Sequence, residues 1–545
     1  MELLPSKATF APGEAPTVEV RGAGGPLDLT LWHLDVAVAS LRLPAGETLA
    51  RFPSQPEGGY GVEARIAGPV RAASDAGVAR TALDVLADPF TRPRYGFIAD
   101  FAPERDATGV ADTVRRLHLN AVQFYDWMYR HATLLAPAGT DRAGSDETFE
   151  DALGRRVSMT SVRRLVRAVH DAGSLALGYA AVYAVGREAW PGWRSEGLFH
   201  PDGTPWTLGE DFLWNVDPTS ERWQAHFTSE LARAVASVGF AGFHLDQYGA
   251  PKRALRSDGS LVDLAEAFPN LIARVAAALP DRHLVFNNVN DFPTWTTATA
   301  PQSATYIEVW PPHSRLAHLA ALVAKARALA PRRTPILAAY LSAYRHDEAA
   351  ARAAERLELA TAWSHGGGVL LHGEAGAALT EAYYVRHKRL GPESLAATRR
   401  SYDFAVRYGD LLFDRDSVDV TRTELGGANE EIRVTAPATL STDADAGTLW
   451  VRAVRGRAGL LLNLIDLTGQ DDDRWDAGKR PPVMLEGVRV AVQRDRATAS
   501  RFLFADPDLS PALQELPSRP EGRYDVAELP RFGAWALLWV APPRS

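Results

Sequence analysis

The chain has 545 residues, of which 46% are hydrophobic and 23% charged, as in ordinary globular proteins, so a disordered or fibrous chain is excluded. The formal net charge is −8 and no cluster of lysine or arginine stands out, which argues against a nucleic acid partner. No apolar run approaches the roughly 20 residues that cross a bilayer, so no membrane partner is expected, and the absence of cysteine excludes disulfides and cysteine-based catalysis or metal binding.

The first 91 residues alternate short apolar runs with turns rich in Gly and Pro. The runs at 17–22, 27–34 and 60–68 have the two-residue period of strands, and no helical period appears until the chain nears residue 80. We expect an N-terminal immunoglobulin-like β-sandwich over residues 1–91.

Residues 92–400 alternate strand and helix patterns. Short β-rich runs lie at 95–101, 121–127, 175–183, 242–249, 284–291, 306–312, 335–342 and 368–374. Helical patterns lie at 108–119, 158–173, 219–239, 262–279, 314–330 and 347–364. Eight strand–helix units in about 290 residues predict a (β/α)8 TIM barrel. A doubly wound open sheet is the alternative, but no Gly-rich nucleotide fingerprint follows any strand.

Residues 401–545 return to strand patterns separated by polar turns. The strand-like runs lie at 448–456, 459–467, 488–493 and 535–540. They predict a C-terminal β-sandwich. The expected fold class is therefore multidomain α/β plus β, with a central barrel flanked by two β-sandwich domains.

Two carboxylates stand out at predicted strand ends, where barrel enzymes place their active sites. Asp246 shares a strand face with His244 in GFHLDQYG, and Glu308 lies between Ile307 and Val309 in YIEVW. Their strands are the fourth and the sixth, so their inward side chains can share one layer of the barrel. We expect this pair to form the catalytic centre.

Glycoside hydrolysis requires such a pair. A retaining enzyme holds the two carboxyl groups ~5–5.5 Å apart, one as the nucleophile and one as the acid/base. The acid/base must keep a proton near neutral pH, and burial beside Tyr306, Val309 and Trp310 would raise the pKa of Glu308. The alternative is that both are structural carboxylates paired with arginine.

Polar and aromatic residues at the other strand ends are candidates for substrate binding. Carboxylates, amides and histidine can bind sugar hydroxyls, and aromatic rings can stack on sugar faces. For Asp126, a cap of the strand-end turn is an equally good alternative. The loops at 128–157 and 184–217 are long and tryptophan-bearing, which suggests a cleft for an extended ligand. The predicted substrate-binding residues are Asp100, Tyr125, Asp126, Trp127, Tyr129, His244, Gln247, Asn288, Trp310 and Glu374.

His244 and Asp246 also have the His-x-Asp spacing of some metal ligands. A zinc site needs three or four converging ligands, and no His-x-His or His-Glu-x-x-His motif supplies the others. We therefore expect neither a metal nor another cofactor. The Gly-x-Ser-x-Gly elbow of esterases is also absent from the sequence.

Six segments, in order, resemble glycoside hydrolase family 66: RYGFIADF, LNAVQFYDWMYRH, GYAAVYAVG, LWNVDP, GFHLDQYG and YIEVW. The family comprises dextranases and cycloisomaltooligosaccharide glucanotransferases, and the resemblance covers roughly residues 92–400. It implies a retaining mechanism with Asp246 as the nucleophile and Glu308 as the acid/base. It also implies an α-1,6-linked glucan, dextran or isomaltooligosaccharides, as the substrate.

Three alternatives to a dextranase-like hydrolase stay open. A cycloisomaltooligosaccharide glucanotransferase would use the same catalytic residues, a glucan-binding protein would need neither, and a metal-dependent barrel hydrolase would lose activity on chelation. Cyclising members of the family carry a carbohydrate-binding module inserted in the barrel. No stretch between the predicted strands is long enough to hold one, so we expect mainly linear oligosaccharide products.

The compartment follows less directly from the sequence. Characterised members of the family are generally secreted. The N-terminal sequence MELLPSKATFAPGE shows neither the basic segment nor the apolar stretch of about 7–15 residues that marks a signal peptide. We expect a cytoplasmic protein, or a secreted one whose signal peptide is missing from the sequence.

Overall fold

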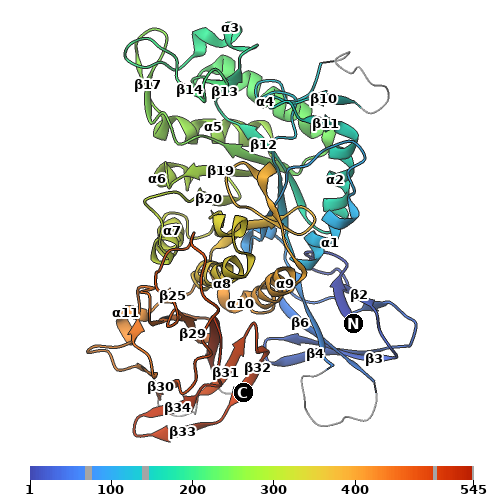
Figure 1. Ribbon diagram of the computed structural model, residues 1–545, viewed down its shortest axis with the longest axis vertical. Helices are drawn as coiled ribbons and strands as arrows, with labels where there is room; N and C mark the ends of the chain where they lie inside the picture. Colours follow the sequence, from blue (N-terminus) through green and yellow to red (C-terminus); the bar gives the residue numbers. More distant parts are fainter. Residues whose placement is uncertain (68–76, 138–146, 495–499, 543–545) are drawn as a thin grey trace.

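The computed structural model describes residues 1–67, 77–137, 147–494 and 500–542. A closed barrel of eight parallel strands lies above two β domains (Figure 1). Each barrel strand pairs with the next one along the chain. The eighth strand pairs with both the seventh and the first, which closes the ring. The predicted (β/α)8 barrel is confirmed. The barrel strands are β8 (Tyr95–Ile98), β9 (Ala121–Phe124), β12 (Leu175–Ala181), β16 (Gly242–Asp246), β19 (His283–Val289), β20 (Ala304–Glu308), β21 (Pro335–Ala338) and β22 (Gly368–Gly373).

Helices follow the strands and cover the outside of the barrel. The longer ones are α1 (Thr108–Arg116), α2 (Met159–Asp171), α4 (Glu221–Val238), α5 (Leu264–Ala278), α7 (Leu316–Leu329), α8 (Glu348–Ser364) and α9 (Pro392–Arg407). Ser158 caps α2 by accepting a hydrogen bond from the backbone N–H of Ser161, and α4 ends at Gly239 with a φ of 89°. Only one short helix, α6 (Thr294–Thr297), follows β19. Within the described ranges, no helix is both long and apolar enough to cross a membrane.

The N-terminal β domain consists of two sheets. One has the order β1-β2-β5 and the other β4-β3-β6-β7, and apolar side chains from both form one core. Its strands are β1 (Glu2–Pro5), β2 (Thr17–Arg21), β3 (Leu27–His33), β4 (Val36–Leu43), β5 (Leu49–Arg51), β6 (Gly58–Ile66) and β7 (Ala79–Val85).

The C-terminal β domain also has two sheets. The larger has the order β25-β28-β29-β35-β31-β32, with β27 beside β28, and the smaller has the order β26-β30-β34-β33. Leu462 lies in the core of this domain, whereas its neighbour Leu461 belongs to the barrel core, so the larger sheet is buried on both faces. Its strands are β25 (Val418–Asp419), β26 (Ile432–Thr435), β27 (Leu440–Ser441), β28 (Leu449–Gly456), β29 (Gly459–Asp466), β30 (Arg489–Gln493), β31 (Arg501–Asp506), β32 (Ser510–Leu516), β33 (Ser518–Glu521), β34 (Tyr524–Glu528) and β35 (Trp535–Ala541).

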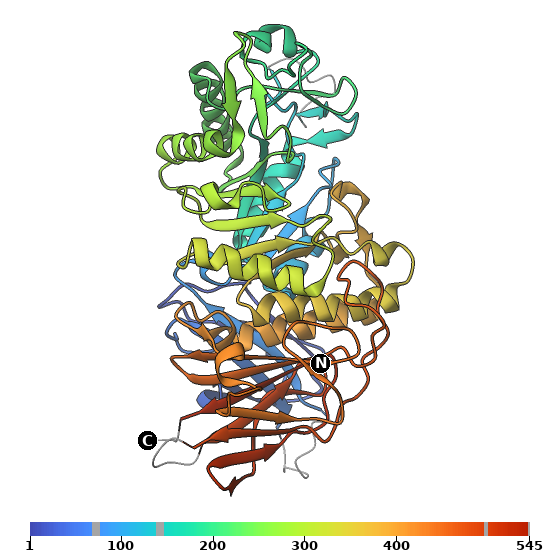
Figure 2. The same cartoon turned by 90° about the vertical axis from the view of Figure 1, so that its left-hand side faces the viewer.

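The last two long barrel helices join the barrel to both β domains, which lie side by side beneath it in Figure 1 and one behind the other in Figure 2. α9 packs against β6 and β7, and α8 packs against β29 and β35. β6 approaches α9 so closely that a Cβ atom at Gly59 would lie 2.0 Å from the carbonyl oxygen of Val406, which only glycine avoids. Arg501 and Asp35 form an ion pair between the two β domains. The predicted domain boundary at residue 400 falls inside α9, so the barrel continues to the end of that helix.

The loops at the carboxyl ends of the strands carry small antiparallel sheets. These begin after β9, β12, β16 and β22 and surround the entrance to the barrel. Of the predicted loop 128–157, residues 138–146 lie outside the described residues. The remaining elements are β10 (Thr148–Glu150), β11 (Arg156–Ser158), β13 (Ala184–Gly186), α3 (Trp190–Trp193), β14 (Thr207–Leu208), β15 (Leu213–Asn215), β17 (Arg253–Leu255), β18 (Leu261–Asp263), β23 (Ala377–Ala378), β24 (Lys388–Arg389), α10 (Gly409–Leu412) and α11 (Thr421–Glu424).

Candidate active site

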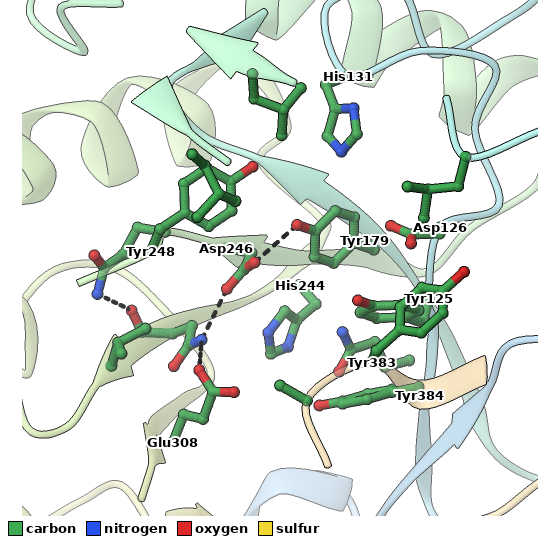
Figure 3. Close-up of a pocket in the computed structure, with 18 of the residues that line it drawn as sticks. Tyr125, Asp126, His131, Tyr179, His244, Asp246, Tyr248, Glu308, Tyr383 and Tyr384 are labelled. Atoms are coloured by element: carbon green, nitrogen blue, oxygen red, sulfur yellow. Dashed lines mark hydrogen bonds between the residues drawn. The ribbon is translucent and has the colours of Figure 1, made fainter. Parts of the chain in front are cut away.

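A cavity of about 730 Å³ opens at the carboxyl ends of the barrel strands (Figure 3). This is where barrel enzymes bind their substrates. Its walls combine carboxylates with many aromatic rings, a composition that suits a sugar ligand. The lining residues are Gln123, Tyr125, Asp126, His131, Leu153, Tyr179, Leu208, Phe212, Leu213, His244, Asp246, Gln247, Tyr248, Asn287, Val289, Glu308, Trp310, Tyr340, Ala382, Tyr383, Tyr384 and Arg386.

Asp246 and Glu308 face each other across one amide group. Asp246 ends β16 and Glu308 ends β20, and β19 lies between these strands. The Nδ2 atom of Asn287 on β19 donates to Oδ1 of Asp246 at 2.8 Å and to Oε2 of Glu308 at 3.0 Å (Figure 3). Because one nitrogen makes both contacts of 2.8 and 3.0 Å, these two carboxylate oxygens are at most 5.8 Å apart.

Neutral hydroxyl groups complete the surroundings of both carboxylates. The Tyr179 hydroxyl donates to Oδ2 of Asp246, and the Tyr340 hydroxyl donates to Oε1 of Glu308, each at 2.8 Å. Neither carboxylate forms an ion pair with an arginine or lysine of the described residues, and no positive side chain appears among the main influences on either pKa. Asp246 therefore receives two hydrogen bonds, Glu308 receives a third from the Trp310 side chain, and neither carboxylate has a compensating charge.

The missing charge compensation raises the pKa of both groups. Burial and the nearby Glu308 carboxylate raise the pKa of Asp246 to about 7, against the hydrogen bonds from Asn287 and Tyr179. Burial also raises the pKa of Glu308 above its ordinary value, against the hydrogen bonds from Asn287, Tyr340 and Trp310. The pair can therefore retain a proton near neutral pH, which general acid catalysis requires.

His244 lies beside Asp246 as a neutral imidazole. Its Nδ1 atom is 3.1 Å from the Tyr95 hydroxyl, and burial lowers the pKa of His244 to about 3. A neutral ring can exchange hydrogen bonds with a sugar hydroxyl. Among the described residues, no three His, Cys, Asp or Glu side chains converge as a metal-binding group.

The opposite wall carries a third carboxylate. Asp126 follows β9 with a φ of 52°, a left-handed conformation that turns its carboxyl group toward the cavity (Figure 3). Burial raises the pKa of Asp126 to about 7, although Arg155 lies 3.6 Å away and opposes this shift. Beside it, Tyr125 stacks on Tyr384 with ring centroids 4.4 Å apart.

Seven of the predicted site residues line the cavity, and one of them, Gln247, uses its side-chain amide for hydrogen bonds to the protein backbone. The seven are Tyr125, Asp126, His244, Asp246, Gln247, Glu308 and Trp310. The side-chain nitrogen of Gln247 donates to the carbonyl oxygens of Asn287 and Phe292, and its oxygen accepts from the backbone N–H of Gly249. Gln247 therefore holds the loop after β16.

Three predicted substrate-binding residues point elsewhere. Trp127 is fully buried, and its indole N–H donates to the carbonyl oxygen of Tyr179. Asn288 faces outward from the barrel, where Thr297 donates to its oxygen and its nitrogen donates to the carbonyl oxygen of Tyr306. Tyr129 does not line the cavity and packs edge-on against a phenylalanine ring.

Glu374 and Asp100 also lie outside the cavity lining. Glu374 is buried, accepts hydrogen bonds from the backbone N–H groups of Ala99 and Asp100 at 2.6 and 2.9 Å, and pairs with Arg105. Asp100 is about half exposed and lies 3.4 Å from the same Arg105 guanidinium group. Glu374 therefore holds the loop after β8 to the end of β22, whereas Asp100 contacts Arg105 within that loop.

The prediction from sequence missed several lining residues. Asn287 is the inward neighbour of the predicted Asn288, and strand period alone does not choose between the two. Tyr179 and Tyr340 lie near strand ends, where the two-residue period could have found them. His131 and Tyr384 come from loops, for which strand periodicity gives no signal.

Comparison with known proteins gives relatives of two named activities. A cycloisomaltooligosaccharide glucanotransferase of Niallia circulans is 28% identical over 375 residues, which are 62% of this chain and 37% of that protein. A dextranase of Streptococcus salivarius is 23% identical over 257 residues, 42% of this chain and 31% of that protein. The chain therefore matches only about a third of the length of these curated relatives.

A solved structure shares the fold along the whole chain. The cycloisomaltooligosaccharide glucanotransferase of Paenibacillus sp., complexed with cycloisomaltoheptaose, has a TM-score of 0.86 at 19% identity over 99% of both chains. The family model for glycosyl hydrolase family 66 matches residues 6–538, which confirms the resemblance found in the sequence. With that match over nearly its whole length, the chain belongs to glycosyl hydrolase family 66.

Proposed function

We propose that the protein is a retaining glycoside hydrolase that cleaves α-1,6-glucosidic linkages in dextran or isomaltooligosaccharides. The observation that carries this proposal is the shared Asn287 amide, which limits Oδ1 of Asp246 and Oε2 of Glu308 to a separation of at most 5.8 Å. Retaining enzymes hold their carboxyl groups ~5–5.5 Å apart, whereas inverting enzymes leave room for a water at ~6.5–9.5 Å. The spacing favours double displacement.

In the first step Asp246 attacks the anomeric carbon while Glu308 gives its proton to the departing glycosidic oxygen. This forms a glucosyl-enzyme and releases the leaving part of the chain. In the second step Glu308 takes a proton from water, which attacks the same carbon and frees Asp246. Hydrogen bonds from Tyr179 and Asn287 stabilise the Asp246 carboxylate before attack and after release.

The substrate class is proposed from the relatives, whose names refer to dextran and to isomaltooligosaccharides. The cavity offers partners for such a sugar. Asp126 and His244 can bind its hydroxyl groups, and Tyr125 and Trp310 can stack on its faces. A non-catalytic glucan-binding protein would need no closely spaced pair of uncompensated carboxylates, which speaks against that alternative.

Digestion of dextran followed by proton NMR tests the proposal. We expect new reducing ends to appear first as the α-anomer, because two displacements restore the configuration. Release of the β-anomer first would contradict the retaining mechanism. Cleavage of starch or pullulan, with dextran left intact, would contradict the proposed linkage.

Transglycosylation is the second candidate, favoured by the curated relatives named as cycloisomaltooligosaccharide glucanotransferases. Hydrolysis and cyclisation share one glucosyl-enzyme and differ in whether water or the far end of the same chain reaches it. We expect linear products. Mass spectrometry decides, since a dominant series one water lighter than linear oligosaccharides would establish cyclisation.

A further inference from the structure

We propose that Asn287 is a positioning residue that fixes the spacing of Asp246 and Glu308 and stabilises whichever of the two is ionised during the reaction. This role rests on the proposed double displacement. Asn287 is 3% exposed, lines the cavity and donates to both carboxylates. It needs no contact with the substrate to act.

The barrel topology puts Asn287 where a bridging group must be. β19 pairs with β16 on one side and with β20 on the other. Side chains alternate along a strand, so Asn287 and Val289 face inward and Asn288 faces outward. An inward residue at this level of β19 therefore stands between Asp246 and Glu308.

The amide group is oriented by the carboxylates alone. A primary amide carries two diverging N–H groups, and here one nitrogen serves an oxygen of each carboxylate. The Oδ1 atom of Asn287 is buried without a hydrogen-bond partner among the described residues. Turning the amide over would bring that oxygen against two carboxylate oxygens, so the observed orientation is the one compatible with the pair.

This arrangement matches the movement of charge in the reaction. Before attack, Asp246 is ionised and Glu308 holds the proton. When the bond from Asp246 to the anomeric carbon forms, the glycosidic bond breaks and the Glu308 proton goes to the leaving oxygen, so the negative charge now resides on Glu308. Asn287 already donates to both groups and can stabilise the anion in both states without moving.

The test compares three variants on dextran and on α-isomaltotriosyl fluoride, whose fluoride leaves without a proton. Asn287→Ala removes both donors, and Asn287→Asp keeps the shape but replaces the donors with acceptors. Asn288→Ala is the matched control, because Asn288 is a buried amide on the same strand that contacts neither carboxylate. Thermal unfolding of each variant accompanies the kinetics.

For Asn287→Ala we expect kcat on dextran to fall about 10²-fold with KM little changed, as when a preorganised donor is lost. In the wild type, the acid limb of kcat/KM reports ionisation of Asp246, whose pKa is raised to about 7. Loss of a hydrogen bond to the ionised form raises that pKa further, so the limb should move up by about one pH unit on both substrates.

Asn287→Asp should be more impaired than Asn287→Ala, because a third carboxylate disfavours ionisation of its neighbours. A merely structural role predicts the reverse, since the aspartate fits the same space. Asn288→Ala should lower thermal stability and leave the acid limb in place. If the wild type is active but the acid limb does not move in either Asn287 variant, the role of Asn287 is refuted and the proposed function stands. If the wild type is inactive on both substrates, the proposed function itself is refuted.

Discussion

Two groups of carboxylates lie at the same edge of the barrel and differ in the partners that hold them. Asp246 and Glu308 accept hydrogen bonds from neutral side chains. Glu374, which is 2% exposed, accepts from two backbone N–H groups and pairs with Arg105. A buried carboxylate without a positive partner has a raised pKa and can exchange a proton, and a positive partner opposes that shift. The strand end therefore brings a carboxylate to this edge of the barrel, and the groups that contact the carboxylate decide whether it can exchange a proton.

The difference between the two groups of carboxylates would be refuted most clearly if Asp246 were dispensable for activity. Asp246→Asn keeps the shape and removes the attacking charge, so kcat on dextran should fall about 10⁴-fold or more. Initial rates of reducing-end release measure this. Thermal unfolding controls for the fold, which should be retained. Activity within tenfold of the wild type would exclude Asp246 as the nucleophile.

Glu308→Gln should show a smaller and substrate-dependent loss. The variant cannot protonate a leaving glycosidic oxygen, so we expect cleavage of dextran to fall about 10²–10⁴-fold. The formation of the glucosyl-enzyme from α-isomaltotriosyl fluoride should be much less affected, because fluoride departs unprotonated. Burst kinetics on the fluoride substrate measure that step. Equal losses on both substrates would assign Glu308 a structural role.

The placement of the proposed catalytic pair was predictable because it depends only on strand order and period. GFHLDQYG and YIEVW place Asp246 and Glu308 inward, two strands apart, and the fold confirms this placement. The same period could not choose between Asn287 and Asn288, since a shift of one residue moves a side chain to the other face. The register of β19 against β16 settles that choice, and register is a property of the whole sheet.

Beyond the strand ends, the two-residue period no longer predicts which way a side chain points. The left-handed conformation of Asp126 reverses the chain after β9, so that Trp127 turns into the core and packs against Phe240. The stacking of Tyr384 on Tyr125 joins residues from opposite ends of the barrel sequence. Such contacts depend on how loops meet in the folded chain, which no local pattern in the sequence reports.

Asp126 stands between the two groups of carboxylates, because it lines the cavity and also lies near Arg155. If it binds a sugar hydroxyl, Asp126→Asn should lower kcat/KM about 10- to 100-fold, the range for a hydrogen bond to a charged group. Stability should be retained, since Arg155 keeps its pair with Asp151 at 2.6 Å. Michaelis kinetics on isomaltooligosaccharides and thermal unfolding check both expectations, and unchanged kinetics would leave only the turn-capping role.

Glu374→Gln should have the smallest effect on activity and a clear effect on stability. The glutamine oxygen can still accept the backbone hydrogen bonds from Ala99 and Asp100, but the ion pair with Arg105 is lost. Breaking a buried pair costs about 3 kcal/mol; Arg105 is 22% exposed and keeps Asp100 nearby, so about 2 kcal/mol is the better expectation.

Urea unfolding measures the loss in stability, and kcat/KM on dextran should stay within about threefold of the wild type, since the loop after β8 keeps its backbone contacts. Arg105→Gln provides the matched control. It removes the same pair from the other side, so the double variant should be less destabilised than the two single losses added together. A Glu374→Gln enzyme with wild-type stability and a more than tenfold loss in kcat/KM would place this carboxylate with Asp246 and Glu308, as its position at a strand end first indicated. The ion pair with Arg105 would then no longer explain why the two groups of carboxylates differ.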